Sequence, residues 1–340
     1  MRPGKLSPEM LAGLLSRLPG GDPRVLVGPR VGEDAAVIEF GDRLLVAKTD
    51  PVTLATDLIG WYAVNVNAND IATMGAKPRW FMATLLLPEA AAEGDAASIF
   101  DQIAEACREL EVAVVGGHTE VSIGLERPIM MGCMLGEMRR EELVTSGGAK
   151  QGDRLVLAGP IAIEGTALLA REVGEELRAR GMGEEALEKA RKLLFQPGIS
   201  VVRAAQTATE AGGVTALHDP TEGGLATGLM ELALASDVGL EVEQEAIPIL
   251  EATREVCDVL QLDPLGLIAS GSLLIAARPE AAEGMVAVLR GAGVEAEVIG
   301  RVVAKEGGLS LVVGGERREL PRFDRDELAR FLEEMVGGEK

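Results

Sequence analysis

The segment from Val64 to Pro78, "VNVNANDIATMGAKP", constrains the fold more than any other part of the chain. Its apolar residues recur at helical spacing, which predicts a mostly buried helix over residues 58–75. The same helix carries three asparagines and an aspartate: Asn65, Asn67, Asn69 and Asp70. Buried amides and carboxylates need partners, so this helix either meets polar groups or a ligand, or turns a solvated polar face outwards.

Strand and helix patterns alternate along the whole chain, which favours a fold of class α+β or α/β. In the first half, strands are predicted over 34–40, 42–50, 79–88, 112–118 and 128–138, and helices over 8–18, 58–75 and 90–110. In the second half, strands are predicted over 153–161, 238–243, 272–279 and 295–303, and helices over 165–191, 200–211, 224–236, 251–260, 280–291 and 324–336. The small polar stretch 146–152 predicts a linker between an N-terminal domain, 1–148, and a C-terminal domain, 149–340.

Charge and cysteine content exclude several functions. The net charge of −21 disfavours nucleic acid and an anionic membrane surface as partners. The sequence contains no run of 18 apolar residues, so we expect no membrane span. It has no apolar leader, so we expect no signal peptide. The three cysteines form no CxxC pair, which is typical of buried thiols in a reducing cytoplasm.

The usual nucleotide and metal motifs are missing from the sequence. It contains no Walker A loop, no GxGxxG that opens a helix, no HExxH and only two histidines. What remains is a set of acidic and amide residues near the ends of predicted strands: Asp34, Asp50, Asn67, Asp70, Glu120 and Asp219. Hard oxygen ligands of this kind suit Mg²⁺ together with phosphate oxygens. Each is also an ordinary turn or cap residue when taken alone.

Five segments, taken in order, resemble the AIR synthase superfamily, and most closely its HypE branch. They are "GEDAAVI", "TDP", "NVNANDIATMGAKP", "VVGGHTE" and "HDPTEGGLATGLMELALASDVGLEVE". The resemblance runs from about residue 31 to residue 302. It implies a PurM-like fold of two domains, in which an N-terminal α+β domain forms a barrel with the same domain of a second copy. A C-terminal α/β domain follows.

The resemblance also implies ATP and Mg²⁺ as cofactors and assigns roles to particular residues. The implied metal ligands are Asp34, Asp50, Asp70 and Glu120. The implied nucleotide-site residues are Asn67, Gly116, Gly117, His118, Thr119, Gly223 and Gly224. The residues implied to act nearest the reaction are His218, Asp219 and Thr221. The expected chemistry is phosphoryl transfer from ATP to an amide or carbonyl oxygen of an acceptor, which is a small molecule or a protein tail.

Three departures from the HypE pattern keep other functions open. The sequence has no cysteine after Cys257, His118 stands in place of a carboxylate, and Ser270 stands in place of a glutamate. These departures favour a nucleotide-binding dimer without catalysis, acting with a partner protein in maturation. A small-molecule kinase related to thiamine-monophosphate kinase is the third hypothesis. The retained carboxylates favour the enzyme.

Overall fold

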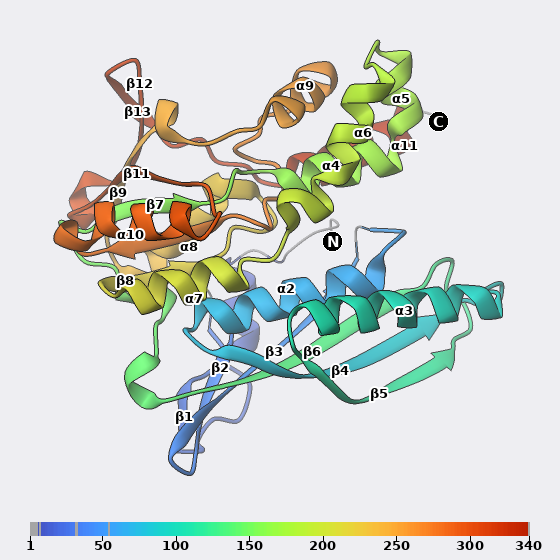
Figure 1. The fold of residues 1–340 in the computed structure, drawn as a ribbon, viewed down its shortest axis with the longest axis horizontal. Helices are drawn as coiled ribbons and strands as arrows, with labels where there is room; N and C mark the ends of the chain where they lie inside the picture. Colours follow the sequence, from blue (N-terminus) through green and yellow to red (C-terminus); the bar gives the residue numbers. More distant parts are fainter. Residues whose placement is uncertain (1–5, 7, 31–32, 54, 339–340) are drawn as a thin grey trace. The chain divides into compact units, whose positions relative to one another are not determined.

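The computed structural model describes residues 6, 8–30, 33–53 and 55–338. The chain forms two compact units (Figure 1). The N-terminal unit comprises Gly20–Pro29 and Asp34–Leu143, and the C-terminal unit comprises Met1–Pro19, Arg30–Glu33 and Val144–Lys340. The class is mixed α and β, with one sheet in each unit.

The N-terminal unit is a six-stranded sheet with two long helices. The strand order is β1-β2-β3-β6-β4-β5, and only β4 and β5 run parallel. The strands are β1 (Val25–Val27), β2 (Ala36–Phe40), β3 (Arg43–Val52), β4 (Lys77–Leu87), β5 (Ala113–Val121) and β6 (Ile129–Met138). Helices α2 (Ile59–Thr73) and α3 (Glu93–Glu109) lie along one face (Figure 1).

Helix α2 lies directly on the sheet because the strand beneath it carries glycine at two buried positions. Along β6 every second residue is buried, as expected of a strand covered on one face. A Cβ at Gly132 would meet the Asn67 amide nitrogen at 2.5 Å, and one at Gly136 would meet Ile71 at 2.3 Å. The helix ends before Gly75, whose φ of +82° is a conformation that glycine adopts without strain.

The C-terminal unit is built on a seven-stranded sheet of order β13-β12-β9-β11-β7-β10-β8. Its strands are β7 (Arg154–Ala158), β8 (Val214–His218), β9 (Gly239–Glu243), β10 (Leu273–Ala277), β11 (Ala296–Val303), β12 (Leu309–Val313) and β13 (Glu316–Glu319). Its helices are α1 (Pro8–Leu15), α4 (Ile163–Glu172), α5 (Gly174–Ala179), α6 (Glu184–Lys192), α7 (Val202–Ala211), α8 (Gly224–Ser236), α9 (Glu251–Leu260), α10 (Pro279–Gly291) and α11 (Glu327–Gly338). Strands β7 and β10 are buried almost throughout, so they form the centre of its core.

Several predicted elements differ from the observed ones. Strand β5 continues through the "GGHTE" residues to Val121, so these residues lie within a strand and not after one. Residues 163–192 form three helices instead of one or two. Strand β8 and the β12–β13 hairpin were not predicted, because β8 is short and the hairpin follows a run of glycine and charge.

The predicted linker is packed against the C-terminal unit. Ser146 is fully buried, and its carbonyl accepts a hydrogen bond of 2.9 Å from the Ser236 hydroxyl. A Cβ at Gly148 would come within 2.0 Å of the Thr215 carbonyl oxygen. Small polar residues therefore mark close backbone packing here, which composition alone does not distinguish from a flexible connection.

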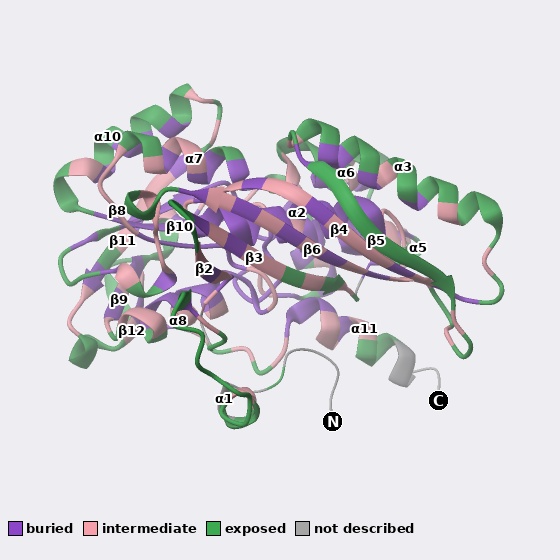
Figure 2. Cartoon of the chain, turned by 90° about the horizontal axis from the view of Figure 1, so that it is seen from below, coloured by how far each residue is buried: buried purple, intermediate pink, exposed green. Residues whose placement is uncertain are grey.

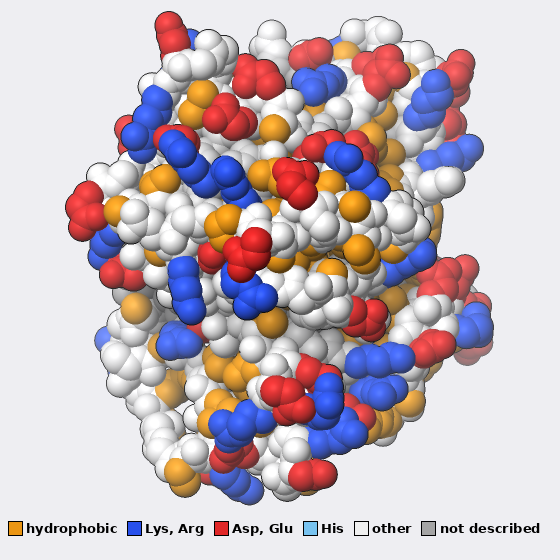
Figure 3. Space-filling model, turned by 60° about the vertical axis from the view of Figure 1, so that its left-hand side comes forward, with side chains coloured by type: hydrophobic (Ala, Val, Ile, Leu, Met, Phe, Trp, Pro, Cys, Tyr) orange, Lys and Arg blue, Asp and Glu red, His pale blue; other side chains and the backbone are white. Residues whose placement is uncertain are grey.

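The surface carries both signs of charge. On the face drawn in Figure 3, basic and acidic side chains are interspersed, with hydrophobic side chains between them. Many of these charges are paired in short-range ion pairs, such as Arg178 with Glu175 and Glu184. Within the described part of the chain, no helix is both long enough and apolar enough to span a membrane.

Candidate functional site

Two of the predicted metal ligands meet at a lysine in the N-terminal unit. The Lys48 amino group lies 3.3 Å from a carboxylate oxygen of Asp50 and 3.4 Å from one of Asp70. Lys48 and Asp50 are two residues apart on β3, so they point to the same face of the sheet, and Asp70 comes from α2. The structure therefore brings two carboxylates from different elements around one positive charge.

The backbone at Asp50 is fixed by the side chain of Asn67. The Asn67 amide oxygen accepts a 2.8 Å hydrogen bond from the Asp50 N–H, and its amide nitrogen donates to the Asp50 carbonyl at 3.3 Å. The same nitrogen donates to the Ala63 carbonyl one helical turn earlier, at 2.8 Å. Asn67 is fully buried. Its role in the structure is to position Asp50, and a direct bond to a phosphate would require breaking these contacts.

The other helix amides have partners of their own. The Asn65 amide nitrogen donates to the Trp61 carbonyl at 3.0 Å, and the Thr73 hydroxyl donates to the Asp70 carbonyl at 2.8 Å. All three asparagines of α2 are buried, which excludes the alternative of a solvated polar face. Asp34, the remaining predicted ligand of the "GEDAAVI" segment, is buried on the coil before β2, while Gly32 of that segment lies outside the described residues.

The first four of the "GGHTE" residues, Gly116 to Thr119, line a hollow at the outer strand of the N-terminal sheet. The hollow has a volume of about 430 Å³ and lies between α3, β4 and β5. It is lined by Ala83, Phe100, Ile103, Ala104, Val114, Gly116, Gly117, His118 and Thr119. Strand β5 is two strands away from β3, since β6 and β4 lie between them. Gly116 to Thr119 and the Lys48 group therefore occupy separate parts of the sheet.

Glu120 contacts two neighbouring side chains at the end of β5. Its carboxylate lies 3.0 Å from the His118 Nε2 and accepts a 2.9 Å hydrogen bond from the Ser122 hydroxyl. Hydrogen bonding from His118, followed by that from Ser122, lowers the pKa of Glu120. His118 and Glu120 are two residues apart on β5 and share one face, and Ser122 follows directly after the strand. The assignment of Glu120 as a metal ligand stays a prediction.

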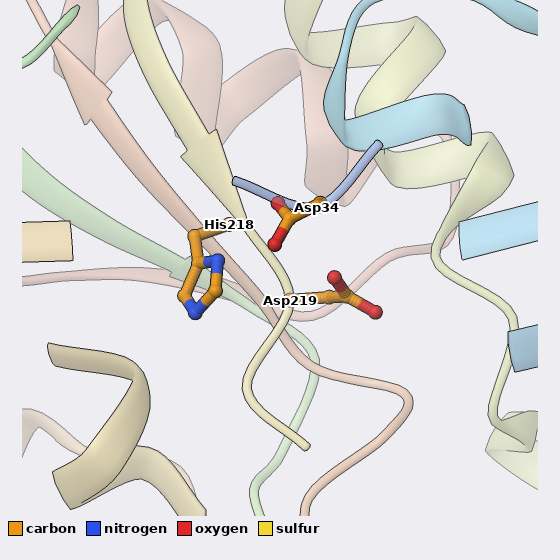
Figure 4. A group of neighbouring side chains, drawn as sticks. All are labelled: Asp34, His218 and Asp219. Carbon is orange, nitrogen blue, oxygen red and sulfur yellow. The ribbon is translucent and has the colours of Figure 1, made fainter. Parts of the chain in front are cut away.

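In the C-terminal unit, the predicted catalytic residues lie at the end of β8 and directly after it. Figure 4 shows the side chains of His218 and Asp219 where this strand ends, and also that of Asp34. Both His218 and Asp219 are buried, and the His218 Nε2 lies 3.0 Å from a carboxylate oxygen of Glu231 on α8. Glu231 therefore orients the imidazole of His218. Their catalytic roles stay predictions.

The loop between β8 and α8 is bonded to two distant segments. The Thr221 carbonyl accepts hydrogen bonds from the N–H groups of Gly224, at 3.0 Å, and Ala269, at 3.3 Å. The Gly223 N–H donates to a carboxylate oxygen of Asp326 at 2.7 Å. A Cβ at Gly224 would meet the Leu265 carbonyl oxygen at 2.4 Å. Gly223 is therefore already bonded to a protein carboxylate, and the close packing explains the glycine at 224.

Two functional candidates were missed by sequence reasoning. Lys48 was overlooked, although its spacing of two residues from Asp50 on a strand places both on one face. Glu164 was overlooked because a glutamate in the first turn of a helix is common. Its burial follows from the packing of α4, which the sequence does not reveal.

Comparisons with known proteins agree with this architecture. Residues 32–138 match the family model "AIR synthase related protein, N-terminal domain", and residues 150–312 match its C-terminal counterpart. A hydrogenase expression/formation protein of Methanocaldococcus jannaschii is 30% identical, with 86% of each chain covered. The carbamoyl dehydratase HypE of Cupriavidus necator is also 30% identical, with 86% of each covered. A crystal structure of the hydrogenase maturation protein HypE in complex with ATP matches with a TM-score of 0.72 and 25% identity, covering 94% of this chain and 91% of that one.

Proposed function

Because the chain belongs to the AIR synthase related family, we propose that it is an ATP- and Mg²⁺-dependent enzyme that phosphorylates an amide or carbonyl oxygen of an acceptor. The observation that carries this proposal is the convergence of Asp50 and Asp70 on Lys48. A relative named carbamoyl dehydratase and a HypE structure with ATP support the same chemistry.

The residues around Lys48 suit a divalent cation. Asp50 and Asp70 already direct carboxylate oxygens towards one positive charge, the Lys48 ammonium group. Mg²⁺ prefers carboxylate oxygens together with phosphate oxygens. We therefore assign Asp50 and Asp70 as the residues that would hold Mg²⁺, with Asp34 and Glu120 as further candidates. Bound there, the ion would neutralise charge on the triphosphate.

The protein's own contribution is to position and neutralise charged groups. Asn67 holds the Asp50 backbone in place from a buried helix, so the carboxylate does not have to be ordered when the nucleotide binds. Lys48 keeps the two carboxylates together and supplies an N–H donor for a phosphate oxygen. Phosphoryl transfer depends chiefly on such positioning and charge stabilisation. His218, Asp219 and Thr221 are proposed to act on the acceptor.

We also propose that the protein forms a homodimer through β5. This strand is at the edge of its sheet and is exposed along its whole length (Figure 2). Val114, Val115 and Val121 on it are 53%, 54% and 62% exposed. A long apolar edge strand invites pairing with another chain, and a second copy forming the barrel fits this edge. Val115→Arg is expected to leave a monomer in analytical ultracentrifugation, whereas an unchanged mass would contradict the β5 interface.

The cellular setting is proposed from the cysteines and the relatives. All three cysteines are free, and burial raises the pKa of Cys107 to about 11 and that of Cys257 to about 12. Such inert thiols suit the cytoplasm. Because M. jannaschii and C. necator relatives are named for hydrogenase expression and carbamoyl dehydration, we propose a maturation partner protein. The net charge of −21 argues against nucleic acid as that partner.

The test is ATP binding followed by product identification. Calorimetry with and without Mg²⁺ is expected to show Mg²⁺-dependent ATP binding. Incubation with ATP and candidate amides is expected to yield phosphate and a dehydrated product in mass spectrometry. Binding without turnover would instead support a non-catalytic nucleotide-binding dimer, and a stable phosphorylated product would indicate a small-molecule kinase. Failure to bind ATP at all would overturn the proposal.

A further inference from the structure

Glu164 is a buried acid with one carboxyl oxygen unaccounted for. It lies in the first turn of α4 and is 5% exposed. Ser270 donates hydrogen bonds to this carboxyl group from its hydroxyl and from its backbone N–H. The other carboxyl oxygen, Oε2, is buried and has no hydrogen-bond partner. A buried acceptor without a partner is costly and calls for an explanation.

The position of Glu164 is set by close packing between three segments of the C-terminal unit. The Gly165 N–H donates to the Ile268 carbonyl at 3.1 Å, and a Cβ at Gly165 would meet Leu267 at 2.4 Å. The segment that ends at Ser270 is hydrogen-bonded to the β8–α8 loop, because the Ala269 N–H donates to the Thr221 carbonyl at 3.3 Å. Glu164 is therefore held at the junction of α4, the segment before β10 and the loop before α8.

Besides burial, the negative charges of two further acids, Asp326 and Glu222, raise the pKa of Glu164. Burial, opposed by hydrogen bonds from Ser270 and assisted by the charges of Asp326 and Glu222, raises the pKa of Glu164 to about 7. Burial likewise raises the pKa of Asp326 to about 6, opposed by bonds from the Gly223, Leu328 and Ile268 amides. Among the described residues, none of the three acids forms an ion pair with Lys, Arg or His. The cluster thus carries uncompensated negative potential.

The geometry favours a nitrogen ligand over a metal ion. In the described part of the chain, these three acids do not bring one oxygen each to within 4.8 Å of one another, as a shared metal ion would require. Both Asp326 oxygens already accept backbone N–H groups, at 2.7 and 2.8 Å. The Glu164 Oε2 is buried without a hydrogen-bond partner, and a single charged N–H donor satisfies it. Glu222 is half buried and is the most exposed of the three acids.

We propose that the Glu164 Oε2 binds a cationic nitrogen group, an ammonium or amidinium, of the molecule that this protein acts on. The ligand places one N–H against the free oxygen, and Asp326 and Glu222 supply the surrounding negative potential. Ser270 holds the other oxygen and so fixes the direction of the carboxyl group. The proposal rests on the proposed function only in calling this ligand the acceptor.

The experiment uses the full chain and acetamidinium as the probe. Acetamide is the neutral probe of the same shape, and potassium chloride is the control for ionic strength. Binding is measured by calorimetry and by the shift in melting temperature near pH 7. Acetamidinium is expected to bind the wild type at least about tenfold more tightly than Glu164→Gln. The matched control Asp263→Asn alters a half-buried acid of the same unit whose pKa is also raised by burial, and its binding is expected to equal that of the wild type.

Three results would overturn the proposal: equal binding of acetamide, an equal effect of potassium, or unchanged binding by Glu164→Gln. If that variant does not fold, the wild type alone decides. A cation beside a partly protonated carboxyl group releases protons on binding, which calorimetry in two buffers of different ionisation enthalpy detects. Absence of both binding and proton release up to about 50 mM probe contradicts the site. ATP binding, measured on the same samples, reports separately on the proposed function.

Discussion

The two units each gather carboxylates, but only one of them provides a base. In the N-terminal unit, Asp50 and Asp70 lie against the Lys48 ammonium group. In the C-terminal unit, Glu164 and Asp326 are buried, form no ion pair with a base among the described residues, and have raised pKa values. The difference shows that carboxylates in the two units have surroundings that suit different ligands. Carboxylates that already surround an ammonium group suit a metal ion in its place, whereas burial without a base favours the protonated form of an acid and so suits a ligand that brings its own positive charge.

The largest expected effect is on catalysis. Asp70→Ala removes one of the two carboxylates at Lys48, and we expect ATP turnover to fall at least about 1000-fold, equivalent to about 4 kcal/mol. Phosphate release with Mg²⁺ present measures this. Asp42→Ala, in the exposed turn between β2 and β3, is the control and is expected to retain full turnover. Equal turnover by Asp70→Ala and wild type would remove Lys48, Asp50 and Asp70 from the site.

The second effect is a pH dependence that belongs to the C-terminal unit. Burial raises the pKa of Glu164 from its ordinary value of 4.5 to about 7. Between these values the folded state binds more protons than the unfolded state. The stabilisation is therefore complete below about pH 4.5 and is lost as the pH rises through 7. The loss for this group is roughly 3 kcal/mol.

Glu164→Gln cannot titrate, so its free energy of unfolding is expected to fall less between pH 5 and 8 than that of the wild type. Urea unfolding at several pH values measures the difference. The exposed Glu283→Gln serves as the control and should follow the wild type. Asp326 titrates in the same direction in both proteins, so the difference isolates Glu164. Parallel curves for Glu164→Gln and wild type would show that Glu164 is not buried as described.

The third prediction concerns the packing beneath Asn67. Gly132→Ala places a Cβ within 2.5 Å of the Asn67 amide nitrogen and 2.9 Å of the Ala63 carbonyl oxygen. We expect a loss of about 1–3 kcal/mol in the free energy of unfolding, measured with urea. At Gly94, near the start of α3, a Cβ meets nothing within 4 Å. Gly94→Ala is therefore the control and should be neutral or stabilising by up to about 1 kcal/mol. A neutral Gly132→Ala would mean that α2 does not approach β6 so closely.

The smallest expected effect comes from removing the base beside Asp50 and Asp70, so that these carboxylates lack a base, as Glu164 and Asp326 do. Lys48→Met leaves Asp50 and Asp70 without their shared base, and we expect a loss of about 1 kcal/mol without added metal. Adding Mg²⁺ should restore more stability to this variant than to the wild type, because the ion then takes the place of the ammonium group. Thermal unfolding with and without Mg²⁺ measures this. An equal response of the two proteins would argue that Asp50 and Asp70 do not hold Mg²⁺.

The sequence predicted most of the fold but less of the site. Helices α2, α8 and α9 and strands β2, β3, β4 and β6 were predicted within a few residues, because their periodicity and flanking glycines are local signals, whereas the short β1 was not predicted. The family and its two-domain fold were predicted from five ordered segments. Strand β8 was not predicted, and β5 was ended too early at His118, since glycines within a strand read as its end.

The limits at the site have a physical origin. The sequence indicated that Asn67 is important, because it is a polar residue on a mostly apolar helix. Its hydrogen-bond partner, the Asp50 backbone, could not be predicted, because it depends on which strand lies beneath α2. Lys48 and Glu164 owe their significance to contacts with residues distant in sequence, Asp70 and Ser270. Burial and pairing across such separations are properties of the packed chain, and no local pattern encodes them.

The pairing of the Asn67 amide with the Asp50 backbone determines which property is lost first when this position is altered. One side chain serves as a peptide-like partner for a strand and as the support of a proposed metal ligand. Damage at this position would lower the yield of folded chain before any defect in turnover became measurable. In the N-terminal unit, stability and the proposed metal binding therefore depend on the same side chain. We expect substitutions that aim at new activity to be better tolerated in the C-terminal unit.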